Sequence, residues 1–198
     1  MNYQNYQKAR DAAWRILIDC NVRELPVQIN SICKQLGVRL YSYQDAEQAI
    51  QNRGLSEIVA HTDGISLYSN DTSIILFDST LSPSRIRFTI AHEMGHIVLG
   101  HVMPGQATFR NREPSPNDDP AETAANQFAA RLLAPACVLW GLNLHTPEEI
   151  SRVCGISMTA ARFRADRMRI LYQRGKFLTS PLERLVYEQF GEFINRQR

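Results

Sequence analysis

Apolar residues recur at helical spacing in the N-terminal part of the chain. Residues 6–21 have an apolar side, formed by Ala9, Ala13, Ile16 and Leu17. Intervals of three and four residues are typical of an amphipathic helix. A second helix is predicted over residues 26–36, because Gly37 follows it as a stop signal. We expect these two helices to frame the unit that follows.

Three short segments rich in apolar and β-branched residues predict strands. They cover residues 38–43, 64–68 and 74–78, and turn-forming residues at 69–71 separate the last two. Together they predict a small antiparallel or mixed sheet. An exposed edge of such a sheet is a place where an extended peptide can bind by backbone pairing.

An apolar stripe in the middle of the chain predicts a longer helix. Ser82 is a suitable N-cap, Pro83 fits the first helical position, and Gly100 fits the stop. The stripe consists of Ile86, Ile90, Ile97 and Leu99. The sequence HEMGH, at residues 92–96, therefore lies within this helix.

The HEMGH motif has the spacing of a metal site. Residues four apart lie one above the other on a helix, so His92 and His96 can both turn a ring nitrogen toward one ion. Glu93 lies about 100° round the helix, where it can hydrogen-bond a metal-bound water and act as a general base. A catalytic zinc has three protein ligands and one open position. We therefore expect a third ligand downstream of the motif.

His101 is one candidate for the third ligand. It follows His96 by five residues, but Leu99 and Val102 occupy the positions where the metzincin pattern requires glycine and histidine. His101 fits better as a residue just beyond the helix end, where the helix dipole favours a positive charge.

Glu122 is the better candidate, although its spacing has a second explanation. It lies at the start of a helix predicted over residues 121–133, whose small residues allow close approach to the Gly95 region. These small residues are Ala124, Ala125, Ala129 and Ala130. Glu122 also fits the third helical position of a capping box that begins at Asp119 and Pro120. From spacing alone, both roles remain open.

Two supporting roles are also considered. Asn126 lies one turn beyond Glu122 on the same face, a position suited to holding a histidine ligand through its other ring nitrogen. A donor that stabilises an oxyanion is expected as well, and the sequence does not favour one among its candidates. These candidates are Tyr68, His61, His101 and His145.

Two separated blocks, residues 87–101 and 122–135, closely resemble the ImmA/IrrE family of metallo-endopeptidases in order and spacing. The first block contains the HEMGH motif, and the second begins with Glu-Thr-Ala-Ala-Asn. Ala134 stands where the family often has methionine, a difference in packing only.

The resemblance implies the chemistry of a gluzincin-type HExxH protease. His92, His96 and Glu122 would bind zinc, and Glu93 would be the catalytic base. Manganese is an alternative metal, because selectivity also follows metal availability. Members of the family cleave helix-turn-helix repressors, so the resemblance implies site-specific cleavage of a repressor of a mobile element, toxin-antitoxin system or stress regulon.

The fold class expected from these features is α+β. A zincin-like helical catalytic domain with a small sheet is predicted over residues 1–141, followed by a helix-turn-helix-like helical region over residues 142–198. Residues 103–120 are rich in Pro, Gly, Ser and Asn and predict a mobile loop over the cleft, or a plain connector.

Composition favours a cytoplasmic protein with no membrane partner. The 198 residues are 44% apolar and 21% charged. No run reaches the roughly 18 apolar residues of a membrane span, and the polar start of the chain does not resemble a signal peptide. Four cysteines without CxxC spacing are expected to be reduced and buried. They are Cys20, Cys33, Cys137 and Cys154.

The C-terminal part of the chain is basic. Residues 151–198 contain ten Lys and Arg against four Asp and Glu, whereas residues 1–150 contain twelve against sixteen. Helices predicted at 146–154 and 158–171, with a turn between them, have helix-turn-helix spacing. Four arginines of the second helix would suit phosphate contacts. They are Arg162, Arg164, Arg167 and Arg169.

This basic region supplies an alternative function. It would make the protein a DNA-binding regulator, or one that titrates a repressor without hydrolysis. The same helices also fit a docking surface for a protein substrate, or a solvated pair whose Ala160, Ala161, Phe163 and Met168 are packing residues.

Overall fold

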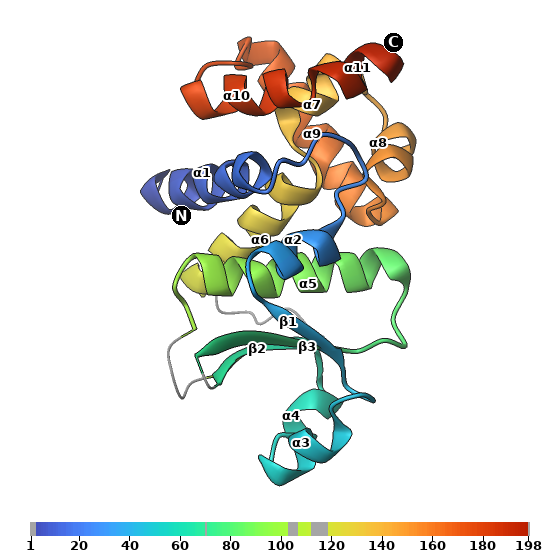
Figure 1. Ribbon diagram of the computed structural model, residues 1–198. Coiled ribbons are helices and arrows are strands. Elements are labelled where there is room, and N and C mark those ends of the chain that lie inside the picture. The colour runs from blue at the N-terminus through green and yellow to red at the C-terminus, as the bar shows by residue number, and fades with distance from the viewer. Residues whose placement is uncertain (1–2, 70, 103–106, 112–118, 198) are drawn as a thin grey trace. The chain divides into compact units, whose positions relative to one another are not determined.

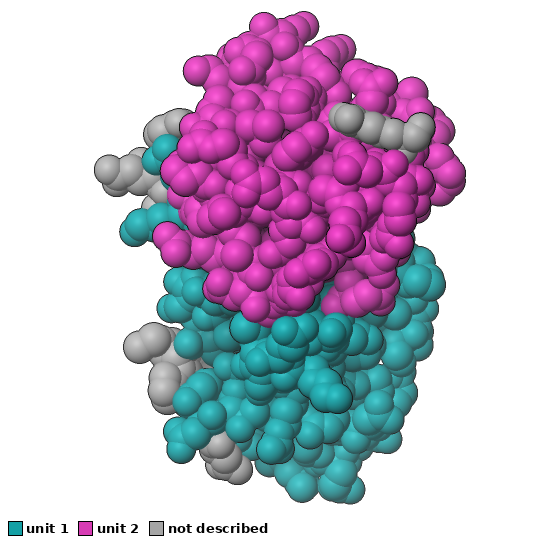
Figure 2. Space-filling view, turned by 45° about the horizontal axis from the view of Figure 1, so that its top comes forward, with its two compact units in different colours: residues 1–9, 29–129 teal, residues 10–28, 130–198 magenta. Residues whose placement is uncertain are grey.

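The computed structural model describes residues 3–69, 71–102, 107–111 and 119–197. The chain forms two compact units (Figure 2): unit 1 comprises residues 1–9 and 29–129, and unit 2 comprises residues 10–28 and 130–198. This grouping does not test the predicted division after residue 141, which stays a prediction. None of the helices in the described segments is long and apolar enough to cross a membrane.

Unit 1 is built on a mixed four-stranded sheet in the order β1-β3-β2-β4. The strands are β1 (Arg39–Ser42), β2 (Thr62–Ser69), β3 (Thr72–Phe77) and β4 (Ala107–Asn111). β1 runs parallel to β3, and β2 is antiparallel to both β3 and β4. The predicted mixed sheet is confirmed. The loop predicted over residues 103–120 is wrong at Ala107–Asn111, which form strand β4. Residues 103–106 and 112–118 of that segment lie outside the described residues.

The two faces of the sheet are covered by different helices (Figure 1). Helix α5 (Pro83–Val98) packs on the face to which Gly64 and Ser66 of β2 point. Because side chains alternate along a strand, Ile65 and Leu67 point the other way, where they form an apolar cluster with Ile50 and Leu76. Helices α3 (Glu47–Asn52) and α4 (Ser56–Ala60), which the sequence did not predict, lie on that side.

Two glycines allow α5 to lie unusually close to its neighbours. A Cβ atom on Gly64 would lie 2.4 Å from Cγ2 of Thr89 in α5, a severe clash. A Cβ atom on Gly95 would lie 3.1 Å from Cα of Ala125 in helix α6 (Pro120–Leu133). The predicted close approach of the alanine-rich helix to Gly95 is confirmed. Helix α2 (Ile29–Gln35) packs against α5 and β1.

Unit 2 is helical. It contains α1 (Tyr3–Asp19) from residue 10 onward and the helices α7 (Ala136–Gly141), α8 (Pro147–Cys154), α9 (Met158–Arg174), α10 (Pro181–Gln189) and α11 (Gly191–Gln197). Its largest fully buried side chains are Leu17, Leu132, Leu133, Leu139, Ile150, Met168 and Phe190. Nε2 of Gln189 donates to the carbonyls of Leu17 and Val22, both at 2.7 Å, and so ties α10 to the end of α1.

Helices α8 and α9 have the predicted helix-turn-helix spacing. Thr146 and Glu149 form the predicted capping box, and α8 ends at Gly155 in the left-handed conformation. The prediction is wrong for two side chains of α9. Arg164 is only 7% exposed and is not available to phosphate, and Phe163 is 73% exposed rather than packed. The helices together with the mixed sheet confirm the α+β class. The four cysteines are buried thiols, as predicted.

Candidate metal centre

The HEMGH motif lies in the most buried part of α5. The helix begins after Ser82, whose backbone is extended, and has Pro83 in its first turn. It ends at Leu99, and Gly100 follows with a positive φ of 75°. Residues 89–96 are all buried. The motif therefore presents its polar side chains to the interior of unit 1.

Three side chains of unit 1 converge at this point of α5. Nε2 of His92 lies 3.0 Å from Nε2 of His96, and the two carboxylate oxygens of Glu122 lie 3.2 Å from His92 Nε2 and 3.0 Å from His96 Nε2. The histidines are buried, and the Glu122 side chain is 34% exposed. Glu122 reaches this position because it lies in the first turn of α6, where Asp119 Oδ1 accepts from the Ala121 N–H at 2.8 Å.

The spacing of these atoms fits a metal ion. Ligand atoms at the usual bond lengths from a tetrahedral zinc lie roughly 3.3 Å from one another. Among the described residues, His92, His96 and Glu122 form a group that could hold a metal, with ligand atoms within 4.8 Å of one another. When both Nε2 atoms present lone pairs beside the Glu122 carboxylate, a bound cation offsets the repulsion among them.

Both histidines are oriented through their other ring nitrogen. Nδ1 of His92 lies 3.0 Å from Oδ1 of Asn126, which only accepts, so Nδ1 donates and Nε2 is left to bind a metal. Nδ1 of His96 lies 3.1 Å from Nδ1 of His101. His101 thus lies behind His96, outside the group of possible ligands. Burial, and then the charge of His96, lowers the pKa of His101.

The charge state of Glu122 suits a ligand. Burial alone would raise the pKa of its carboxyl, but hydrogen bonds to His92 and His96, together with the charges of these rings, outweigh burial and hold the pKa well below its usual range. Glu122 is therefore an anion at neutral pH. Glu122 occupies the first turn of α6, as predicted, and its carboxylate contacts both histidines.

Glu93 is held by a residue that the sequence did not indicate. Ser66 Oγ, on β2, donates to Glu93 Oε2 at 2.6 Å, and both residues are fully buried. The available signal was a small polar residue in an otherwise apolar strand, two positions after Gly64. The pairing itself depends on how β2 lies against α5, which the sequence does not specify. Of the oxyanion candidates, His145 lies in unit 2 beside Asn143 and Tyr172.

Comparison with known proteins agrees with this geometry. No curated protein matches the chain. The model of a peptidase family, described as the IrrE N-terminal-like domain, matches residues 33–166, about two thirds of the chain. The match includes the HEMGH motif, Glu122, Asn126 and Ser66. The chain therefore belongs to the family of metallopeptidases with an IrrE N-terminal-like domain.

Proposed function

We propose that this protein is a zinc-dependent, site-specific endopeptidase whose substrate is a helix-turn-helix repressor. The observation that carries the proposal is the convergence of His92, His96 and Glu122 within 3.0–3.2 Å, beside the buried Glu93 of the same helix. Membership of a peptidase family supports peptide hydrolysis as the reaction.

His92, His96 and Glu122 would hold the metal, which when bound supplies a water of lowered pKa and polarises the scissile carbonyl. Glu93 accepts a proton from the attacking water, and the water oxygen bonds to the carbonyl carbon. The C–N bond then breaks as Glu93 delivers that proton to the leaving amine. Ser66 holds one carboxylate oxygen of Glu93 during this transfer, and Asn126 fixes the ring of His92.

Zinc is the metal that we favour. Two imidazole nitrogens and one carboxylate oxygen are the ligands of many catalytic zinc sites, which keep a further position for water. Manganese prefers sites with more oxygen ligands, so it is the less suitable occupant of this group. Metal analysis of protein purified without added metal distinguishes the two.

The substrate class is proposed from the resemblance to the ImmA/IrrE family and is tested by cleavage. The purified protein is incubated with any helix-turn-helix repressor encoded near its own gene, and the products are identified by mass spectrometry. We expect two fragments from one cut, and no fragments with a chelator or with Glu93→Gln. If the repressor stays intact while a reporter under its control is induced by coexpression of this protein, hydrolysis is not the mechanism.

A regulator that acts without hydrolysis is the second candidate, because α8 and α9 have helix-turn-helix spacing. Several features of α8 and α9 weaken direct DNA contact. Arg164 is buried, Arg169 is paired with Asp166 at 3.1 Å, and the first turn of α8 carries Glu148 and Glu149, which repel phosphate. A regulator of this kind would retain its effect in the Glu93→Gln variant, whereas the peptidase would lose it.

A further inference from the structure

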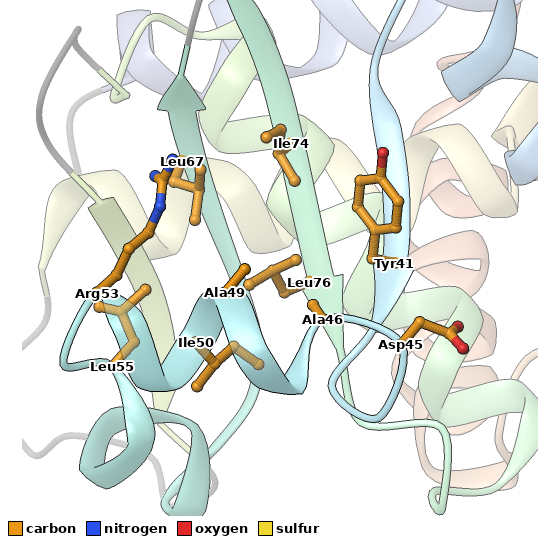
Figure 3. A pocket seen from close by; sticks show the side chains of 10 residues that line it. All are labelled: Tyr41, Asp45, Ala46, Ala49, Ile50, Arg53, Leu55, Leu67, Ile74 and Leu76. Carbon is orange, nitrogen blue, oxygen red and sulfur yellow. The ribbon is translucent and has the colours of Figure 1, made fainter.

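A pocket lies on the face of the sheet opposite the metal centre (Figure 3). Its volume is about 270 Å³, and it lies between the outer face of β1, β2 and β3 and helix α3. The lining residues are Tyr41, Asp45, Ala46, Ala49, Ile50, Arg53, Leu55, Leu67, Ile74 and Leu76. All of them belong to unit 1. The pocket shares none of them with the metal centre.

The pocket has an apolar floor. Leu67 and Leu76 are each 5% exposed and Ile50 is 4% exposed, and together with Ile65 they form the apolar cluster under α3. Ala46 and Ala49 line the helical side, and because their side chains are small they leave the space above the floor open. A hollow of this size, with apolar walls and few polar groups, is the usual form of a site for a small molecule.

The two charged side chains of the pocket lie beyond opposite ends of α3, and the Tyr41 hydroxyl is its third polar group. Arg53 follows the C-terminus of the helix and Asp45 precedes its N-terminus. The Arg53 guanidinium donates to Ser69 Oγ at 2.9 Å, which holds it at the end of β2. In the described parts of the chain, Arg53 forms no ion pair, so most of its five N–H donors are available.

Asp45 gives the other end of the pocket a negative charge. Its Oδ2 accepts from Ser42 Oγ at 2.7 Å, so the carboxylate is fixed at this end. A ligand with one carboxylate near Arg53 is therefore favoured over a ligand of the same length with a carboxylate at both ends, because Asp45 repels the second charge.

We propose that this pocket binds a small monocarboxylate with an unbranched apolar body of about seven carbons, which its volume of about 270 Å³ can hold. The apolar body contacts Leu67, Ile74 and Leu76, and the carboxylate pairs with Arg53. Leu67 is the neighbour of Ser66 on β2, so the ligand and the Glu93 contact lie on opposite faces of one strand.

Octanoate is the probe that tests this assignment, in titration calorimetry with the full chain. We expect saturable binding with a Kd below about 1 mM. Octanedioate and 1-octanol, of equal length, should each bind about fivefold more weakly than octanoate. Arg53→Gln should weaken the binding of octanoate about fivefold and leave the binding of 1-octanol unchanged.

A pair of variants on α3 tests the location. Ala49 is exposed and lines the pocket, so Ala49→Phe should fill it and weaken octanoate at least about tenfold. Gln48 is exposed and does not line the pocket, so Gln48→Phe should bind octanoate as the wild type does. Unchanged thermal unfolding of both variants verifies that they are folded.

Three results would overturn the proposal. These are the absence of saturable octanoate binding, binding that Ala49→Phe leaves unchanged, and 1-octanol binding as tightly as octanoate. If octanoate does not bind but Ala49→Phe slows cleavage of a protein substrate, the pocket instead receives an apolar side chain of that protein. The binding test does not depend on peptidase activity, so its failure is distinguishable from failure of the proposed function.

Discussion

Helices α5 and α9 are nearly equal in length, with 16 and 17 residues, but they bury different kinds of side chain. α5 buries four polar side chains in a row of eight residues, namely Thr89, His92, Glu93 and His96. The side chains buried by α9 are Ala161, Met168 and Arg164. Burying polar groups costs free energy unless they are paired or bind a ligand. α5 therefore buries the polar groups of the candidate site, whereas α9 is mainly a packed scaffold.

The largest effect is expected from a substitution of Glu93, one of the polar side chains that α5 buries. Glu93→Gln keeps the size of the side chain but removes the base, so cleavage should slow by about 10²–10⁴-fold. The Ser66 hydroxyl can still donate to the amide oxygen, so metal content and folding should be unchanged. Single-turnover cleavage and elemental analysis of the same sample measure both. Wild-type turnover in this variant would refute the assignment of Glu93 as base.

The role of α9 as a packed scaffold is tested with two of its apolar side chains, one buried and one exposed. Met168 is 1% exposed, so Met168→Ala should lower the free energy of unfolding by about 2–5 kcal/mol. Phe163 is 73% exposed, so Phe163→Ala should change it by less than about 0.5 kcal/mol. Urea denaturation followed by circular dichroism gives both values. A large loss for Phe163→Ala would show that this side chain is packed after all.

A smaller effect is expected where α6 supports the metal centre. Asn126→Ala removes the acceptor for His92 Nδ1 and should weaken metal affinity about 10–100-fold. Asn126→Asp keeps an acceptor oxygen at the same place and serves as the matched control, with affinity close to the wild type. Competition with a zinc chelator of known affinity gives these values. Equal metal affinities for wild type and Asn126→Ala would show that Asn126 does not position His92 for metal binding.

The smallest effect is expected at Ser66, which positions Glu93 from β2. Ser66→Ala should lower kcat about tenfold, because Glu93 loses the contact that fixes its carboxylate. KM and metal content should stay at wild-type values, since Ser66 lies outside the group of possible metal ligands. Steady-state kinetics separates the two parameters. A change in KM alone would contradict a positioning role.

The parts of the molecule that the sequence predicts well are those marked by residues close together in the chain. Ser82, Pro83 and Gly100 mark the ends of α5, and the four-residue spacing of the histidines places them on one face. Thr146 and Glu149 likewise mark the start of α8 through a capping box. Each of these features depends on residues close together in the chain.

Several features that depend on distant residues were not predicted. Strand β4 pairs with β2 across about forty residues, in a segment rich in loop-forming residues. The Ser66–Glu93 contact and the exposure of Phe163 depend on how elements pack in each unit. The helices α3 and α4 are only six and five residues long, too short for a clear periodic pattern.

Binding of one metal ion by His92, His96 and Glu122 is the basis of the proposed function. Elemental analysis of protein purified without added metal tests it most directly, with wild type compared with His92→Ala, Glu122→Ala and Glu93→Gln. We expect about one zinc per chain in wild type and in Glu93→Gln, and loss of the metal after dialysis in His92→Ala and Glu122→Ala. Zinc retained at the wild-type level in both His92→Ala and Glu122→Ala, or a wild-type protein that cannot be loaded with any divalent metal, would contradict it.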